Sequence, residues 1–216
     1  MTTAIIDYGS GNLRSAAKAF ERAAAENGIA DPILVTSRPE DVAKADRIVL
    51  PGVGAFADCR RGLAAVPGLE AALVEAVMAR GRPFLGICIG MQLMAERGRE
   101  FETVEGLGWL PGEVVPIAPS DPALKIPHMG WNEVTVVKPH PLLRKVSVGD
   151  EFYFVHGYYP QPKQVSEVYA TTEYERTFAC ALGRANYFAT QFHPEKSGRV
   201  GLELLACFAT WDGRPC

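Results

Sequence analysis

A cysteine between two glycines is the residue in this sequence whose setting most favours covalent chemistry. Residues 86–90 read Gly-Ile-Cys-Ile-Gly, between an apolar run and a helical pattern of apolar residues. A nucleophile on a tight turn from strand to helix stands clear of the sheet, and the flanking glycines let the two elements approach closely. The start of a helix would also favour the thiolate of Cys88. The alternative is a buried cysteine that packs as a small apolar residue.

A histidine and a glutamate two residues apart form the second candidate group, in the string Gln-Phe-His-Pro-Glu at residues 191–195. Pro194 disfavours a helix at His193, and in an extended chain the side chains of residues i and i+2 lie on the same face. Glu195 could therefore orient the imidazole while its other nitrogen faces a thiol. The alternative is a solvated loop. Because Cys88 and His193 are 105 residues apart, only the fold can bring them together.

Two glycine-rich turns offer backbone N–H groups. The turn Gly52-Val53-Gly54 follows an apolar run, and it could complete an oxyanion hole with the backbone N–H of Ile89. The alternative is an ordinary turn between a strand and a helix. The turn at residues 9–14 lacks the third glycine and the later acidic residue of a dinucleotide fingerprint, so we reject a nucleotide site there.

Alternating strand and helix patterns must position these groups in the first half of the chain. Short apolar runs predict buried strands, and apolar residues at helical spacing predict helices between them. The predicted strands are 3–7, 32–35, 47–50 and 83–87, and the predicted helices are 13–24, 69–77 (closed by Gly81) and 91–97. Strands separated by helices in this way indicate a parallel sheet.

The pattern changes near Trp109, where short β-branched runs punctuated by proline and glycine begin. They predict strands at 113–115, 133–137, 151–155, 167–171, 177–182 and 185–190, followed by a helix at about 200–211. No linker separates the two halves. We therefore expect one α/β domain over residues 1–216, with a largely antiparallel second portion.

Composition excludes several classes of protein. Hydrophobic residues make up 48% and charged residues 22% of the 216 residues, and the net charge is −3, so binding to nucleic acid by phosphate neutralisation is not expected. No apolar run approaches the ~20 residues that span a bilayer, and no secretory signal is visible. Five scattered cysteines without a CxxC pair argue against a disulfide framework or a zinc site. We expect a cytoplasmic protein.

The strings at 86–92 (GICIGMQ) and 191–195 (QFHPE), in this order and at this spacing, resemble the class I (triad) glutamine amidotransferase family over nearly the whole chain. Four further strings resemble its glutaminase subunits of imidazole glycerol phosphate synthase, namely DYGSGN at 7–12, PGVGAF at 51–56, PHMGWN at 127–132 and YFVHGYY at 153–159. The resemblance implies a three-layer, flavodoxin-like α/β fold. Its central sheet would be mostly parallel, with a peripheral antiparallel portion.

The resemblance also implies a role for each matching residue. Cys88 would be the nucleophile, His193 the base and then the acid, and Glu195 the carboxylate that orients it. The remaining implied residues are an oxyanion hole of Gly52, Val53 and Ile89, glutamine contacts at Gly52, Gln92, His156, Gly157 and Tyr158, and a partner interface at Asn12, Met129 and Trp131. Gly157 departs from the pattern, because these subunits usually carry Ser or Thr there. No metal or other cofactor is needed for this chemistry.

The implied partner is the cyclase subunit of imidazole glycerol phosphate synthase, a (β/α)₈ barrel that would form a heterodimer with this chain. Ammonia from glutamine would pass to it for the synthesis of imidazole glycerol phosphate and aminoimidazole carboxamide ribonucleotide in histidine biosynthesis. One alternative is the glutaminase of another amidotransferase, against which the string at 127–132 argues. The other is a catalytically silent scaffold, against which the intact Cys88, His193 and Glu195 argue.

The remaining histidines and cysteines carry weaker expectations. We expect His140, between two prolines, to lie in a surface loop, and His128 to belong to an interface strand or a structural turn. Cys180, Cys207 and Cys216 are expected to be packing or surface thiols, and Cys59 is expected to be the most exposed of the four.

Overall fold

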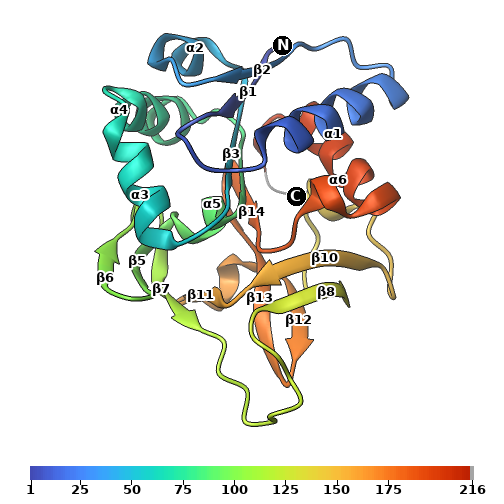
Figure 1. Cartoon of the computed structure of the whole chain (residues 1–216). Helices are drawn as coiled ribbons and strands as arrows, with labels where there is room; N and C mark the ends of the chain where they lie inside the picture. Colours follow the sequence, from blue (N-terminus) through green and yellow to red (C-terminus); the bar gives the residue numbers. More distant parts are fainter. Residues whose placement is uncertain (215–216) are drawn as a thin grey trace.

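The centre of the molecule is an eight-stranded sheet, seen in a computed structural model that describes residues 1–214 (Figure 1). Its strands, in spatial order, are β2 (Ile33–Thr36), β1 (Thr3–Ile6), β3 (Arg47–Gly52), β4 (Phe84–Cys88), β14 (Tyr187–Thr190), β13 (Arg176–Arg184), β12 (Val168–Tyr174) and β9 (Thr135–Val136). The first five strands pair in parallel and the last three pair antiparallel. The predicted mostly parallel sheet with an antiparallel portion is confirmed.

Helices cover both faces of the parallel part. Helices α1 (Leu13–Glu26) and α6 (Gly198–Thr210) lie on one face, and α3 (Phe56–Ala65) and α4 (Leu69–Val74) lie on the other (Figure 1). Every residue of β1, β3, β4 and β14 is buried, as a sheet covered on both faces requires. The short elements on this part of the chain are α2 (Pro39–Lys44), a π-helical turn (Glu75–Ala79) and α5 (Ile89–Gln92).

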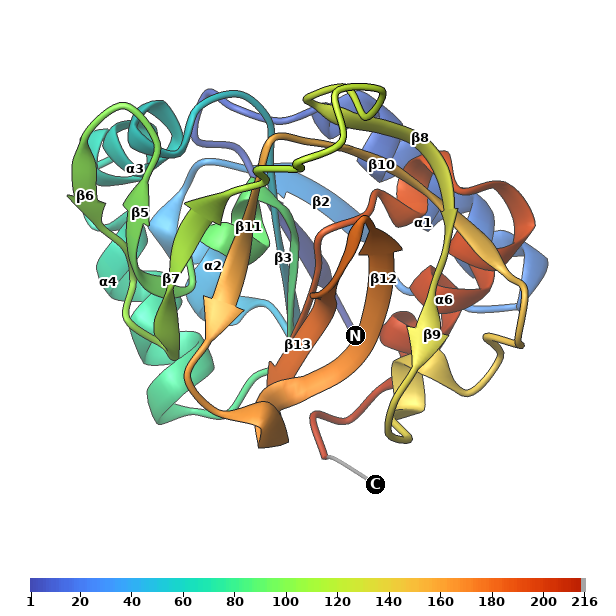
Figure 2. The ribbon, with the colours of Figure 1, turned by 90° about the horizontal axis from the view of Figure 1, so that it is seen from below.

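Two smaller sheets flank the central one (Figure 2). The first pairs β8 (His128–Glu133) with β10 (Glu151–His156), antiparallel, and the second has the order β11 (Tyr158–Pro162), β7 (Leu110–Pro116), β5 (Ala95–Arg99) and β6 (Thr103–Glu105). Three 3₁₀ turns complete the chain, at Pro141–Leu143, Val165–Glu167 and Pro194–Lys196. Strands β10 and β11 are separated by Gly157 alone, which places that residue where the two small sheets meet.

The helix predicted for residues 91–97 is wrong. Helix α5 is a single turn, and the chain then turns into strand β5. The carbonyl oxygens of Leu93, Ala95 and Glu96 accept bonds from the backbone N–H groups of residues 106–108, so a sheet-like ladder replaces the helical one. Because α5 is so short, its macrodipole contributes little at Cys88.

Other sequence predictions need smaller corrections. Residues 33–36 form an edge strand in which only Thr36 is buried, because β2 has a single neighbour in the sheet. The sequence did not predict helices α2 and α3. Pro39, at the start of α2, and the glycine-rich turn at 52–54, just before α3, are residues typical of turns. The predicted C-terminal helix is confirmed with bounds Gly198–Thr210.

The expectations for His140 and Cys59 are wrong, because both side chains are buried. The ring of His140 stacks on Phe188 with the ring centres 4.2 Å apart, and its Nδ1 accepts a bond from the backbone N–H of Leu142. Cys59 lies under the loop that carries Val53. Cys180 and Cys207 are buried packing thiols, and Cys216 lies outside the described residues.

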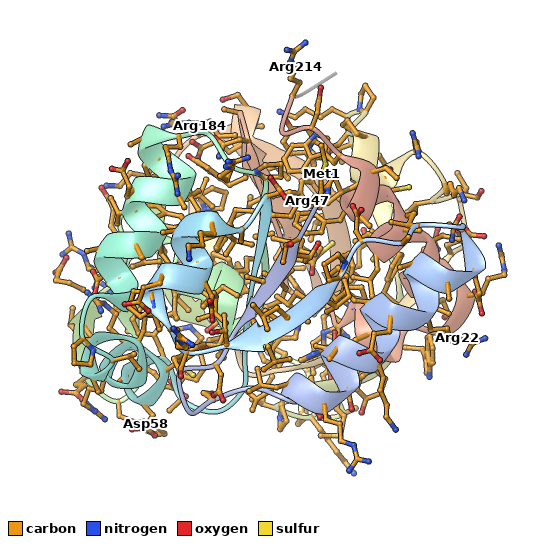
Figure 3. The ribbon with its side chains drawn as sticks, turned by 90° about the horizontal axis from the view of Figure 1, so that it is seen from above. Met1, Arg22, Arg47, Asp58, Arg184 and Arg214 are labelled. Carbon is orange, nitrogen blue, oxygen red and sulfur yellow. The ribbon has the colours of Figure 1, made fainter. Side chains whose placement is uncertain are left out.

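The N-terminal strand, β3 and the C-terminal segment are held together by polar contacts at one end of the sheet. The buried Arg47 donates to the carbonyl oxygen of Trp211 and forms an ion pair with Asp31, which also pairs with the amino group of Met1. Figure 3 shows Arg47 beside Met1 among these side chains. The two ends of the described chain are thereby anchored to the same buried cation.

Among residues 1–214, no single helix is long and apolar enough to cross a membrane. One pair, Phe56–Ala65 with Leu69–Ala79, reaches that length and composition only in combination, and it is bent by 96°.

Candidate active site

Three neighbouring parallel strands end at the same place and bring the candidate residues together. Gly52 at the end of β3 pairs in register with Cys88 at the end of β4, and Thr190 at the end of β14 pairs with Ile87. The segment that carries His193 follows β14 directly. Because the carboxyl ends of parallel strands meet at one edge of the sheet, a site is expected there.

Cys88 occupies a strained turn. Its φ is +54° and its ψ is −111°, outside the regions that residues other than glycine usually adopt. β4 ends at this residue and α5 begins at the next, so the side chain is turned out of both elements. Strain of this kind costs on the order of 1–3 kcal/mol and persists where the surroundings enforce it.

The glycines around Cys88 are required by packing. A Cβ on Gly90 would lie 1.7 Å from the carbonyl oxygen of Leu50, and one on Gly86 would lie 2.9 Å from that of Gly90. A Cβ on Gly52 would lie 2.5 Å from the hydroxyl of Tyr8 and 2.8 Å from the Cβ of Ile89. Only glycine fits at these three positions, which explains the close approach of the strand, the turn and the loop.

His193 and Glu195 form a buried pair beside Cys88. The Nδ1 of His193 lies 2.7 Å from the Oε1 of Glu195, and both side chains are almost fully buried. A carboxylate only accepts, so Nδ1 carries the proton and Nε2 is left for another partner. Among residues 1–214, the Nε2 of His193 has no hydrogen-bond partner, and both His193 and Cys88 line one cavity.

The charge state of His193 is set by opposing effects. Burial alone lowers the pKa of the imidazole, but its interactions with Cys88 and Glu195 outweigh burial and raise that pKa to about 10. At neutral pH the imidazole therefore holds its proton, next to a thiol and a carboxylate. An imidazolium in this position can donate a proton to a leaving group.

Gln191 is a neighbour of Cys88 that the sequence did not identify. Its side-chain amide donates to the Sγ of Cys88 over 3.6 Å, and its Oε1 accepts a bond from Gln92. Gln92 also donates to the carbonyl oxygen of Tyr158. The spacing argument applied to His193 and Glu195, extended back by two residues, would have found Gln191.

The loop Gly52-Val53-Gly54 is held by two side chains from elsewhere. The backbone N–H of Val53 donates to the Oγ of Ser10 at 3.3 Å. The carbonyl oxygen of Val53 accepts bonds from Ser10 Oγ at 2.6 Å and from Cys59 Sγ at 3.3 Å. The N–H of Val53 is therefore already in use, and it is not free for an oxyanion in this conformation.

A cavity of about 320 Å³ connects most of the predicted site residues. Its lining includes Val53, Cys88, Ile89, Gln92, His156, Gly157, Tyr158 and His193. Glu100 also lines it, as the only carboxylate among the described lining residues, and accepts a bond from the backbone N–H of Phe56. A Cβ on Gly157 would meet only Ile126, at 3.4 Å, so the position has room for the Ser or Thr of the family pattern.

The three predicted interface residues lie at the surface. Met129 and Trp131 on β8 are 61% and 53% exposed, and the ring of Trp131 packs edge-on against Tyr153. Exposed Asn12 caps α1, because its side-chain oxygen accepts a bond from the N–H of Ser15. Large exposed apolar side chains next to each other are typical of interaction surfaces.

No group of three or more His, Cys, Asp or Glu side chains within residues 1–214 is arranged to hold a metal ion. The described carboxylates near the site are already engaged, Glu195 by His193 and Glu100 by a backbone N–H.

Comparisons with known proteins agree with this geometry. The family model for class-I glutamine amidotransferases matches residues 4–209. Proteins named imidazole glycerol phosphate synthase subunit HisH are similar to the chain. The one from Cereibacter sphaeroides is 57% identical and the one from Brucella suis 56%, each over 98% of this chain and 99% of the relative. A solved glutamine amidotransferase structure is 17% identical with a TM-score of 0.65, over 94% of this chain and 98% of that one, and shows the same fold. The chain belongs to the class-I glutamine amidotransferases and, among them, to the HisH subunits of imidazole glycerol phosphate synthase.

Proposed function

We propose that Cys88, His193 and Glu195 are the triad with which this glutamine amidotransferase hydrolyses glutamine. The observation that carries the proposal is the shared cavity, which both Cys88 and buried His193 line, and the Nε2 of His193 has no hydrogen-bond partner among the described residues. Glu195 holds the imidazole through its Nδ1. A nucleophile, a base and an orienting carboxylate in this order are the requirements of acyl transfer.

The reaction follows from these positions. The thiolate of Cys88 attacks the side-chain amide carbon of glutamine, and the carbonyl oxygen becomes an oxyanion. The C–N bond then breaks as imidazolium His193 protonates the leaving nitrogen, which releases ammonia and leaves a thioester. Water attacks the thioester with neutral His193 as base, and glutamate leaves. The amide of Gln191 supports the charged sulfur by its bond to Sγ.

We propose that Gly52, Val53 and Ile89 form the oxyanion hole and that Gln92, His156, Gly157 and Tyr158 bound the glutamine site together with Gly52. The backbone N–H of Ile89 follows the nucleophile directly, as in other strand–turn–helix nucleophiles. Glu100 is suited to the α-ammonium group of glutamine, since it is the one carboxylate in the cavity lining. Because the N–H of Val53 is bonded to Ser10, the hole completes only when this loop changes conformation.

We propose that the ammonia passes to the cyclase subunit of imidazole glycerol phosphate synthase, an expected (β/α)₈ barrel in a heterodimer with this chain. The subunit name of the HisH relatives supports the existence of such a partner. Met129 and Trp131, with Asn12, are the surface residues that we assign to the contact. Products would be imidazole glycerol phosphate and aminoimidazole carboxamide ribonucleotide.

Two further parts of the proposal concern the chain as a whole. We propose that residues 1–216 act as one domain, because the central sheet draws strands from residues 3 through 190. We also expect a reducing, cytoplasmic setting, since the four described cysteines are free thiols.

The test is a Cys88→Ala variant purified with its partner. Glutamine-dependent synthesis should fall by several orders of magnitude, since a triad acts as a unit. Synthesis from added ammonium salt at raised pH should continue at the native rate, because that chemistry belongs to the partner. Cys207→Ala, which removes a buried thiol from α6, is the matched control and should keep both activities. Retained glutamine-dependent synthesis in Cys88→Ala would refute the triad, and loss of both activities would refute the division of labour.

A further inference from the structure

Two buried histidines lie outside the proposed triad and face each other across two strands. His128 begins β8 and His156 ends β10, and the two residues are partners in the register of this pair. Their exposed fractions are 3% and 5%. The Nδ1 of His128 lies 3.0 Å from the Nε2 of His156. A buried contact between two imidazoles requires that one donates and the other accepts.

The direction of this contact is fixed at the His156 end. The Nδ1 of His156 lies 2.9 Å from the carbonyl oxygen of Tyr158, which can only accept, so Nδ1 carries the proton. In a neutral imidazole the Nε2 then carries a lone pair and can only accept a hydrogen bond. His128 must therefore donate to it from its own Nδ1, which leaves the Nε2 of His128 as an acceptor.

The same direction follows independently from the other end. The side-chain nitrogen of Asn132 lies 3.2 Å from the Nε2 of His128. The orientation of this amide is fixed, because its nitrogen also donates to the carbonyl oxygen of Glu173 and its oxygen accepts from the backbone N–H of Glu133. Asn132 thus donates to His128, His128 to His156, and His156 to Tyr158. A proton added to either ring would sit on Nε2 and face a donor there, Asn132 in the case of His128 and His128 in the case of His156.

Aromatic packing holds both rings in this geometry. His128 stacks on Phe154 and on Tyr174, with ring centres 4.9 Å and 4.2 Å apart, and His156 packs edge-on against Phe178. Burial also lowers the pKa of His128 to about 4 and that of His156 to about 3. Both rings are therefore neutral at physiological pH, which is the state that the chain of donors requires.

We propose that Asn132, His128 and His156 are positioning residues that fix the wall of the glutamine site at Gly157 and Tyr158. This inference rests on the proposed function of the cavity. The Tyr158 carbonyl oxygen is held between two donors, His156 and Gln92, and Gly157, Tyr158 and both donors line the cavity. The bonds begin at Asn132, next to the exposed Trp131, so the strand that carries the interface residues also sets the wall of the site.

The first test reads the tautomers directly, by two-bond ¹⁵N–¹H correlation spectra of the full chain labelled with ¹⁵N-histidine. His128 and His156 should both be in the Nδ1–H tautomer at neutral pH. His140 is the internal control, because its Nδ1 accepts a bond from Leu142 and it should be in the Nε2–H tautomer. In Asn132→Asp, which is nearly isosteric, the donor becomes an acceptor, and His128 should become an imidazolium. An Nε2–H tautomer of His128 or His156 in the native chain, or an unchanged His128 in the variant, would overturn the proposal.

The second test separates positioning from stability, with glutaminase kinetics of the complex with the partner. His128→Phe keeps an aromatic ring in the stack but removes both hydrogen bonds. The KM for glutamine should rise by about tenfold while kcat stays within about twofold of native, because the wall binds the ground and transition states alike. A loss of folded enzyme alone would lower the apparent kcat and leave KM unchanged.

His140→Phe is the matched control, because it also removes a hydrogen bond from a buried, stacked histidine, but outside the cavity lining. It should leave KM at the native value. Asn132→Leu provides the readout if His128→Phe does not fold. It should raise KM by about threefold, since the chain of donors to Tyr158 loses one neutral hydrogen bond, and the bonds to Glu173 and Glu133 that are also lost lie outside the cavity lining. If the native complex hydrolyses glutamine through Cys88, an unchanged KM in both His128→Phe and Asn132→Leu would overturn this inference alone. A native complex without glutaminase activity would instead overturn the proposed function.

Discussion

At the scale of single residues, the contact between His193 and Glu195 decides how the imidazole is used. The 2.7 Å bond to Glu195 uses Nδ1, so Nε2 is the nitrogen left available. His193 and Cys88 line the same cavity. Glu195 has no other polar partner for its second oxygen among the described residues. We therefore propose that Glu195 orients and stabilises the ring, and that the proton that moves during the reaction is the one on Nε2.

Glu195→Gln tests this role. The change keeps the size of the side chain but removes its charge, so it no longer favours imidazolium His193. We expect kcat for glutamine hydrolysis to fall by about two orders of magnitude or more, with little change in KM, because the ring is needed in the transition state. His193→Asn should cost more. Glu203→Gln, which removes a carboxylate of α6 paired with Arg199, is the control. A native kcat in Glu195→Gln would exclude the residue from the triad.

At the scale of elements, we propose that the loop after β3 links the nucleophile to the state of the partner. Both backbone polar groups of Val53 are bonded. Its N–H, in the Gly52–Val53 peptide, donates to Ser10, and its C=O, in the Val53–Gly54 peptide, accepts from Ser10 and Cys59. Gly54 beside it has a φ of +100°, a conformation that glycine adopts at little cost. Rotation of the Gly52–Val53 peptide would free the N–H of Val53, but only after its bond to Ser10 breaks.

Ser10→Ala therefore should raise the glutaminase rate of the chain without its partner. Loss of one neutral hydrogen bond of about 1–1.4 kcal/mol, the one that holds the N–H of Val53, corresponds to roughly a five- to tenfold increase. The rate of the full complex with its ribonucleotide bound should stay within about twofold of native, since the bonds are already broken there. Glutamate release measures both rates, with Cys207→Ala as control. A lower rate in the isolated variant, or a proportional rise in both states, would contradict this role of Ser10.

The sequence predicted some of these elements and not others. Apolar runs predicted the parallel strands well, because β1, β3, β4 and β14 are buried on both faces. The sequence could not predict that α5 stops after one turn, because the partners of its last carbonyl oxygens come from residues 106–108. The contact of Ser10 with Val53 was also missed, since the two residues are 43 positions apart in the sequence and such a contact leaves no local pattern.

At the scale of the whole molecule, four histidines give stability a maximum near neutral pH. Burial lowers the pKa of His128 and His140 to about 4 and that of His156 to about 3, below the ordinary 6.5. Between these values the unfolded chain binds more protons than the folded chain does. The free energy of unfolding therefore decreases as the pH falls from 6.5 toward 4. His193, with its pKa raised to about 10, acts in the opposite sense. Its contribution is complete below 6.5 and is lost as the pH rises toward 10.

Urea unfolding between about pH 4 and pH 10 measures both slopes, and each proton contributes about 1.4 kcal/mol per pH unit. His193→Asn should reduce the alkaline slope of the free energy of unfolding against pH by the contribution of one proton, and leave the acid slope unchanged. His140→Phe should reduce the acid slope by the contribution of one proton, and leave the alkaline slope unchanged. An alkaline slope that His193→Asn does not alter would show that the raised pKa of this histidine is not linked to folding.

The most direct measurement of the central claim is covalent labelling with a glutamine-like diazo ketone, followed by peptide mass analysis of the complex. The fold exposes one cysteine to the cavity and buries the other three described thiols away from its lining. We predict a single label on Cys88, loss of glutaminase activity in proportion to labelling, and protection by excess glutamine. A label on Cys59, Cys180 or Cys207, or full activity after Cys88 is labelled, would contradict the account.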